Sequence, residues 1–198
     1  MLNVVRLGFG SAAIVAMTYQ FATLNVRPDY AKGNFFSFFT IQSNIIAVTA
    51  LFALVLVPRA RRTALFDGAR SAAVLYMAIT GVVFALLLSG LQEELQTTIP
   101  WVDFVVHKLM PVALVADWLV DSPRHRLPRW TVLAWLSYPV AWFGYTLVRG
   151  EVVDWYPYPF VDVSRIGYDG VLGRSVVLVI GFAAAGAALL WLGNRRAR

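Results

Sequence analysis

Six hydrophobic runs, separated by polar connections, follow one another along the chain. Each is close to the roughly 20 residues that a helix needs to cross the hydrocarbon core of a bilayer. The pattern predicts an all-α membrane protein, with one domain of six transmembrane helices that takes up residues 1–198. We expect the helices at residues 3–24, 36–57, 68–91, 101–120, 130–148 and 171–193.

The composition supports this class of protein. Hydrophobic residues make up 59% of the chain and charged residues 14%, whereas about a quarter of the residues in a soluble domain are charged. The chain has no cysteine and two histidines. This excludes thiolate catalysis and cysteine-bound metals, and it leaves too few histidines for a multi-haem carrier. We expect no cofactor and no metal site.

Basic residues gather in alternate connections, after the second, fourth and sixth runs. The connections after the third and fifth runs are acidic. Because Lys and Arg concentrate on the cytoplasmic side of a membrane, we expect the basic segments and both termini in the cytoplasm. The basic residues are Arg59, Arg61, Arg62, Arg70, Arg124, Arg126, Arg129, Arg195, Arg196 and Arg198, and the acidic ones are Glu93, Glu94, Glu151, Asp154, Asp162 and Asp169.

A polar stripe runs into the start of the second hydrophobic run. Its members are Ser37, Thr40, Ser43 and Asn44, whose helical spacing predicts that they share one face of a continuous helix. Polar side chains inside a membrane need partners or a cavity, which makes them candidates for function. In the alternative interpretation, Thr40 only bonds the carbonyl four residues earlier in its own helix.

The fourth run is the least apolar and carries Asp103, His107, Lys108 and Asp117. Because an isolated charge inside a membrane costs about 2.5–3.5 kcal/mol, this helix should be interior and its charges paired. Asp103 lies four residues before His107, so its carboxylate can orient the imidazole. Alternatively, His107 only bridges two helices by hydrogen bonds. Asp117 is expected to be a structural partner of a cytoplasmic arginine.

The expected topology places Thr40 roughly 6 Å and His107 roughly 9 Å below the outer surface, at the helical rise per residue. We therefore expect a cavity in the outer half of the bundle. The proline-rich, aromatic segment 154–160 would be either a lid over this cavity or an anchor at the membrane surface. The other side chains expected around the cavity are Thr18, Tyr19, Ser89, Trp142, Tyr145 and Thr146.

Several segments together resemble a known family. They are Phe38-Phe39-Thr40-Ile41-Gln42-Ser43-Asn44, His107 with Pro111, Asp117-Trp118, Tyr138-Pro139, Tyr156-Pro157-Tyr158-Pro159-Phe160 and Gly167-Tyr168. With them the chain resembles a bacterial member of the androgen-induced gene 1 family, which includes the Pr6Pr-type membrane proteins. The eukaryotic members are six-helix membrane hydrolases of fatty acid esters of hydroxy fatty acids, with an intramembrane Thr and His. The resemblance implies that Thr40 and His107 are the catalytic pair.

The residue types suit this chemistry. A threonine hydroxyl becomes a nucleophile when a neighbouring base accepts its proton, and a neutral histidine is the usual base. Attack on an ester would give an acyl-threonine that water hydrolyses. The donors that stabilise the oxyanion stay open among Gln42, Ser43, Asn44 and Lys108. The other supporting residues that we expect are Ser37, Asp103, Trp142, Tyr145 and Tyr158.

A second class of function stays open, namely a non-enzymatic lipid-binding membrane protein or a small-solute transporter. In that case Thr40, Asp103 and His107 would bind rather than react. The sequence lacks the matching broken helices that are typical of transporters, which favours the enzyme. The expected partners are membrane lipids and a lipid-ester substrate, not nucleic acid, and the expected location is a bacterial cytoplasmic membrane.

Overall fold

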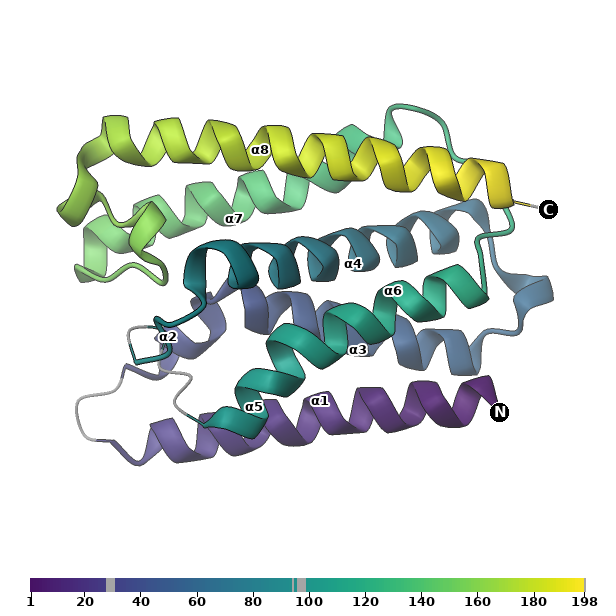
Figure 1. The fold of residues 1–198 in the computed structure, drawn as a ribbon, viewed down its shortest axis with the longest axis horizontal. Helices are drawn as coiled ribbons and strands as arrows, with labels where there is room; N and C mark the ends of the chain where they lie inside the picture. Colours follow the sequence, from purple (N-terminus) through teal and green to yellow (C-terminus); the bar gives the residue numbers. More distant parts are fainter. Residues whose placement is uncertain (28–30, 94, 96–98, 198) are drawn as a thin grey trace.

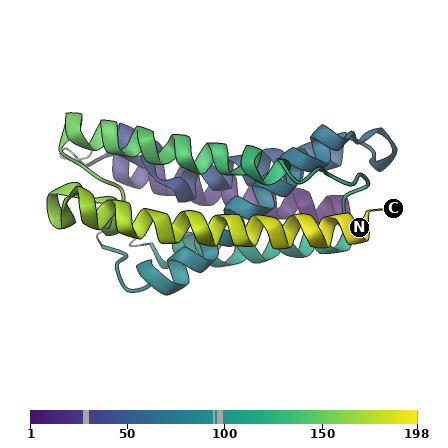
Figure 2. The same ribbon diagram turned by 90° about the horizontal axis from the view of Figure 1, so that it is seen from above.

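The computed structural model describes residues 1–27, 31–93, 95 and 99–197, and all the regular structure in these residues is helical. The long helices run side by side along one axis (Figures 1 and 2). They are α1 (Leu2–Asn25), α3 (Phe39–Leu56), α4 (Ala64–Val83), α6 (Met110–Val120), α7 (Thr131–Val153) and α8 (Val163–Arg196). The short elements are α2 (Lys32–Ser37), η1 (Arg59–Arg61), the π-helical η2 (Phe84–Leu88), α5 (Pro100–Phe104), the π-helical η3 (Val105–Leu109) and η4 (Pro159–Val161).

Five of the described helices are long and apolar enough to cross a membrane, namely α1, α3, α4 together with η2, α7 and α8. The surface of the bundle carries large apolar side chains such as Leu86, Leu133 and Val177, which are 75%, 70% and 69% exposed. An apolar surface of this extent suits contact with lipid. These features identify an all-α membrane protein.

The expected fourth membrane helix consists of α5, η3 and α6, which together cover residues 100–120. It is not among the five apolar spans, but it lies within the bundle, with α6 against α4 and η3 against α1 (Figure 1). Asp103, His107 and Asp117 are buried, as the sequence predicts for an interior helix. The prediction is wrong for Lys108, whose side chain is exposed.

The second hydrophobic run is broken, whereas the sequence predicted a continuous helix. Phe38 has an extended backbone (φ −67°, ψ 127°) and separates α2 from α3. Its ring packs edge to face against Trp155 and Tyr158, with centroids 5.5 and 5.6 Å away. These long-range contacts outweigh the local preference for one helix. As a result, Ser37 ends one helix and Thr40 lies in the first turn of the next, so they do not share the face of a single helix.

Two π-helical segments face each other across the bundle. The ring of Phe84, at the start of η2, stacks on the imidazole of His107 in η3, with centroids 4.0 Å apart and planes 9° apart. One turn away, Gly81 lets the backbones approach, because a Cβ there would lie 3.0 Å from a side-chain atom of Pro111. Single π-turns inside α-helices often occur at functional sites. His107 therefore lies in a type of helical segment that is common at functional sites.

The link between α7 and α8 packs onto the bundle, as the lid interpretation requires. It leaves α7 at Asp154, which has a left-handed conformation (φ 52°). Pro157 and Tyr158 are buried, and Trp155, Tyr156 and Phe160 are partly buried. The link ends where the Asp162 carboxylate caps the first turn of α8. The aromatic rings of this link therefore form part of the protein core rather than a free surface loop.

Both termini lie at one end of the bundle, together with η1 and the connection from α6 to α7 (Figure 1). We call this the terminal end, and we call the opposite end, which carries the α7–α8 link, the link end. The basic segments that the sequence assigned to the cytoplasm therefore gather at one end. Glu94 and Arg198, which also supported that topology, lie outside the described residues.

Candidate functional site

His107 and Asp103 form the pair that their spacing predicts. Nδ1 of His107 lies 2.8 Å from Oδ1 of Asp103, and both side chains are buried. Because a carboxylate only accepts hydrogen bonds, Nδ1 donates in this contact, and Nε2 is the nitrogen that carries the lone pair in the neutral ring. The stacked ring of Phe84 covers one face of the imidazole. The pair thus holds an imidazole in a fixed orientation with one basic nitrogen.

Thr40 lies in the first turn of α3 and is buried. Its hydroxyl is 3.3 Å from the hydroxyl of Tyr158, and its backbone N–H donates to the same oxygen over 3.2 Å. The alternative bond to the carbonyl of Phe36 is not made, and that carbonyl accepts from Nε2 of Gln42 instead. A helix that begins at residue 39 offers Thr40 no helical carbonyl four residues earlier.

Two cavities meet at Thr40. The smaller has a volume of about 10 Å³ and is lined by Thr40, His107, Gln20 and Tyr158 among apolar side chains. This space is close to the minimum that a water molecule needs. The larger cavity, of about 370 Å³, lies between α4, α7 and α8. Thr40 and Tyr158 are the two described residues that line both cavities.

The wall of the larger cavity is almost entirely apolar, but it contains buried hydroxyl groups. Oγ1 of Thr80 and Oγ of Ser175 have no hydrogen-bond partner in the described structure, and both residues line this cavity. Leaving a buried donor or acceptor unsatisfied costs about 1–3 kcal/mol. Thr80 and Ser175 therefore bring unsatisfied hydroxyl groups to the wall of this cavity.

Asn44 connects the two catalytic candidates. Its Nδ2 donates to the carbonyl of Thr40 over 2.9 Å and to the carbonyl of Val106 over 3.1 Å. Val106 precedes His107 in η3, so this amide fastens the start of α3 to the π-helical segment. Asn44 was one of the oxyanion donors that the sequence left open. The structure shows both protons of Nδ2 engaged with backbone carbonyls.

Except for Trp142, the other supporting candidates lie apart from the two cavities. Ser37 bonds the hydroxyl of Tyr145 and the carbonyl of Gly33, and Gln42 bonds Tyr138 and Phe36. Lys108 is exposed, and Ser43 is buried but lines neither cavity. Trp142 does line the larger cavity, and its Nε1 donates to the carbonyl of Ser37 over 3.0 Å.

The sequence predicted that several polar side chains at the depth of Thr40 and His107 would line one cavity. This prediction is largely wrong. Thr18, Tyr19 and Ser89 are exposed on the surface of the bundle. Thr146 is buried but lines neither cavity. Nothing in the sequence marked the other residues that line the cavities or contact His107, namely Gln20, Thr80, Phe84 and Ser175. Depth along a helix is readable from sequence, but the direction in which each side chain points depends on helix rotation.

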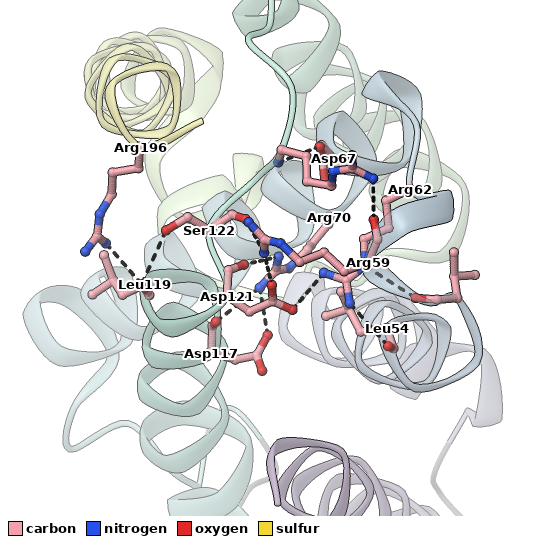
Figure 3. Close-up of polar contacts among 12 residues, drawn as sticks. Leu54, Arg59, Arg62, Asp67, Arg70, Asp117, Leu119, Asp121, Ser122 and Arg196 are labelled. Atoms are coloured by element: carbon pink, nitrogen blue, oxygen red, sulfur yellow. Dashed lines mark hydrogen bonds and ion pairs between the residues drawn. The ribbon is translucent and has the colours of Figure 1, made fainter. Parts of the chain in front are cut away.

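A second group of buried polar residues lies at the terminal end (Figure 3). Asp117 accepts from Arg6 over 2.7 Å and from Arg70 over 2.8 Å. Asp121 accepts from Arg6 over 2.5 Å, from Arg62 over 2.7 Å and also from Arg59. We call these six residues the arginine–aspartate cluster. It joins α1, α4 and α6, and it confirms the structural role predicted for Asp117.

The cluster also determines the charge state of Asp121. Burial by itself would raise the pKa of this carboxyl group, but hydrogen bonds from Arg6 and Arg62 and the charge of Arg70 lower the pKa below its usual value. Asp121 is therefore ionised under all ordinary conditions. Asp121 thus acts in the cluster as a paired charge rather than as a group that exchanges protons near neutral pH.

Nearby, Asp67 organises the connection from α6 to α7. Its Oδ2 accepts from the backbone N–H groups of Arg124 and His125, over 2.9 and 3.0 Å, and contacts Nδ1 of His125 at 2.8 Å. The second histidine of the chain is thus far from Thr40 and supports a loop. Among the described residues, no group of three or more His, Asp or Glu side chains could hold a metal ion.

No family model matches the chain, and neither the curated proteins nor the solved structures include a significant match.

Proposed function

We propose that this protein is an integral membrane hydrolase of lipid esters, with Thr40 as the nucleophile and His107 as the general base. One observation carries the proposal: Thr40 forms part of the wall between a large apolar cavity and a small cavity that contains His107. An ester bound in the large cavity would contact the hydroxyl of Thr40, and His107 would act as the base from the small cavity. The resemblance to the androgen-induced gene 1 family supports the same pair of residues.

The large cavity suits an acyl chain. Its volume of about 370 Å³ is within the range usual for ligand sites, roughly 300–1,000 Å³. Several of its lining residues, including Val140, Val176 and Ile180, are 53–63% exposed on the surface between α7 and α8. The cavity thus reaches the apolar surface of the bundle, and a lipid can enter it sideways from the membrane.

The unpartnered hydroxyls of Thr80 and Ser175 favour an ester over a plain hydrocarbon chain. A purely apolar ligand would leave both groups buried and unsatisfied, whereas an oxygen atom of the ligand can accept from them. The cavity therefore combines apolar walls with three hydroxyls, those of Thr40, Thr80 and Ser175. This combination fits a long chain interrupted by an ester group.

His107 would act on Thr40 through the small cavity. A single water there has Thr40, His107 and Tyr158 as polar neighbours, and two to four such partners are what a buried water requires. Nε2 would take the proton of the Thr40 hydroxyl through this water while the oxygen attacks the ester carbonyl. The resulting imidazolium is stabilised by Asp103, and it returns the proton to the departing alcohol. Water then hydrolyses the acyl-threonine to the free acid.

The proposed topology adds residues 100–120 as a sixth membrane helix and puts the terminal end in the cytoplasm of a bacterial cell. The basic segments at that end support this direction. Because the chain has no native cysteine, single cysteines at positions 61 and 126 can be probed with an impermeant thiol reagent. They should react only after the cells are permeabilised. Reaction in intact cells would show that the terminal end faces outward, and the site would then lie in the inner half of the membrane.

The nucleophile is tested with Thr40→Ala and Thr40→Ser in purified protein. The Ala variant should stay folded, with a stability loss of about 1 kcal/mol, and should lose both lipid-ester hydrolysis and labelling by a fluorophosphonate probe. The Ser variant should keep part of the activity because it retains the hydroxyl.

Thr49→Ala is the matched control, since Thr49 lies on the same helix, is exposed and bonds the carbonyl of Ile45. It should behave like wild type. A folded Thr40→Ala protein with wild-type hydrolysis would make Thr40 structural, and the lipid-binding or transport interpretation would replace the enzyme.

A further inference from the structure

Tyr158 reaches from the α7–α8 link into the bundle and stops at the start of α3. Its ring stacks on Phe160, with centroids 5.2 Å apart and planes 4° apart. Phe38 and Trp142 pack against it at centroid distances of 5.6 and 5.9 Å. The side chain is 5% exposed. Aromatic neighbours on several sides therefore hold the phenol in one place.

The start of α3 supplies the second part of the arrangement. The first N–H groups of a helix have no carbonyl partner in their own helix, and the break at Phe38 makes Thr40 one of these residues. Its N–H donates to the hydroxyl of Tyr158 over 3.2 Å, and its Oγ1 is 3.3 Å from that hydroxyl. A backbone donor and a phenol therefore meet beside the proposed nucleophile.

The phenol remains a donor in this position. Burial raises the pKa of Tyr158, and the hydrogen bonds from Thr40 and from the backbone of Phe39 offset only part of that effect. A protonated tyrosine hydroxyl can donate one hydrogen bond and accept others. In the resting structure Tyr158 accepts from the backbone N–H of Thr40, and either hydroxyl can donate in its contact with Oγ1 of Thr40. Rotation of the phenol O–H can turn its proton toward a carbonyl oxygen.

We infer that Tyr158 and the backbone N–H of Thr40 form the oxyanion hole of the site, an assignment that rests on the proposed function. When the Thr40 oxygen bonds the carbonyl carbon, the π electrons of the C=O bond move to the carbonyl oxygen. That oxygen accepts the N–H bond now accepted by Tyr158, and it accepts the Tyr158 proton in a second bond. When the C–O bond to the leaving alcohol breaks, the electrons return and the C=O bond reforms. Hydrolysis of the acyl-threonine repeats these steps with water as the nucleophile.

This assignment replaces the donors that the sequence suggested. Gln42 and Asn44 donate to the backbone carbonyls of other residues, and Lys108 is exposed. Tyr158, in contrast, lines both cavities together with Thr40. A nucleophile whose own backbone N–H helps to bind the oxyanion is familiar from serine hydrolases.

The test is Tyr158→Phe, which keeps the packed ring and removes the hydroxyl. We expect kcat for lipid-ester hydrolysis to fall by a factor on the order of 10²–10³, with KM little changed, because the lost bond strengthens as the oxyanion forms. Labelling by the fluorophosphonate probe should slow by a similar factor, because negative charge also builds up on the phosphoryl oxygen in the transition state of attack at phosphorus. A merely structural role would instead lower the unfolding temperature or raise KM.

Tyr76→Phe is the matched control, because the hydroxyl of this buried tyrosine donates to the carbonyl of Trp135 and the residue lines neither cavity. It should keep the wild-type kcat. Incorporation of a fluorinated, more acidic tyrosine at position 158 provides a second variant that keeps the hydroxyl. Its kcat and the pH at which activity declines should both change, which covers the case in which Tyr158→Phe fails to fold.

Thr40→Ala is measured in parallel to separate the two proposals. If Thr40→Ala is inactive and folded Tyr158→Phe has the wild-type kcat, the oxyanion assignment is wrong and the hydrolase proposal stands. If Thr40→Ala hydrolyses like wild type, both proposals fail together. An unchanged kcat in the fluorinated variant across the pH range would likewise overturn the role of Tyr158.

Discussion

The two ends of the bundle bury polar residues in opposite ways. At the terminal end, Asp117 and Asp121 are each surrounded by arginines at salt-bridge distance, and the nearby carboxylate of Asp67 caps a connection. Toward the link end, the hydroxyls of Thr40, Thr80 and Ser175 have one long contact or none. Cavities adjoin these hydroxyls, whereas arginine side chains surround the carboxylates of Asp117 and Asp121.

This difference separates a site that holds the protein together from one that is ready for a ligand. Buried charges are tolerated when they are paired and hydrogen-bonded, and removing one partner is costly. Buried hydroxyls next to empty space gain hydrogen bonds only when something binds. Substitutions at the terminal end should therefore affect folding, and those around the cavities should affect catalysis.

The largest effect is expected for His107→Asn. The amide can still donate to Asp103, so the buried carboxylate keeps a partner, but the basic Nε2 is lost. Turnover of lipid esters should fall by a factor on the order of 10²–10⁴, with little change in the unfolding temperature. Steady-state hydrolysis and thermal unfolding of the same preparation measure both quantities.

His125→Asn serves as the control, since His125 contacts Asp67 at the terminal end. Its turnover should match wild type. Equal losses of turnover in the two variants would mean that His107 has no special role in the chemistry.

Asp117→Ala should have the largest effect on stability. It leaves Arg6 and Arg70 buried without their shared carboxylate, which should cost about 3–5 kcal/mol. Denaturant unfolding in detergent measures the loss. The fraction that remains folded should hydrolyse esters at the wild-type rate, because the cluster lies at the other end of the bundle from Thr40. A turnover defect in that folded fraction would show that the two ends are coupled.

Thr80→Val and Ser175→Ala should change substrate selection rather than folding. Each removes an unpartnered hydroxyl, so the stability should stay the same or rise slightly. If these groups bind oxygen atoms of the ester, each loss should weaken binding by about 0.5–1.5 kcal/mol. This corresponds to a rise in KM, or in the dissociation constant of an ester analogue, by a factor of roughly 2 to 13. An unchanged KM in the double variant would show that neither hydroxyl binds the substrate.

The smallest effects are expected from the exposed edge of the cluster. The side chain of Arg59 is 46% exposed, and a surface ion pair contributes about 0–1 kcal/mol, so Arg59→Ala should barely change the unfolding temperature. The lowered pKa of Asp121 adds a pH dependence. A carboxyl group whose pKa is depressed in the folded state stabilises the protein above its unfolded pKa of about 4 and loses that contribution as the pH falls further. Asp121→Asn should abolish this part of the acid sensitivity in pH-dependent unfolding.

Features of the molecule that depend on local spacing were predictable from the sequence. Runs of apolar residues indicated the long helices, because their length must match the bilayer. The spacing of four residues was enough to pair Asp103 with His107, since such positions are neighbours on one turn. The position of Asp117 near the cytoplasmic end of its helix marked it as a structural partner of arginine, although its partners, Arg6 and Arg70, come from two other helices.

The tertiary structure decided what depends on packing between distant segments. The break at Phe38 follows from its contacts with Trp155 and Tyr158, and no local propensity indicates it. The contact between Thr40 and Tyr158 joins residues 118 positions apart, and Thr80 and Ser175 line one cavity only because of how α4 and α8 are rotated. A hydrophobic pattern determines that a helix forms and roughly how deep each residue lies. The direction of a side chain and the space in front of it are determined only when the helices pack together.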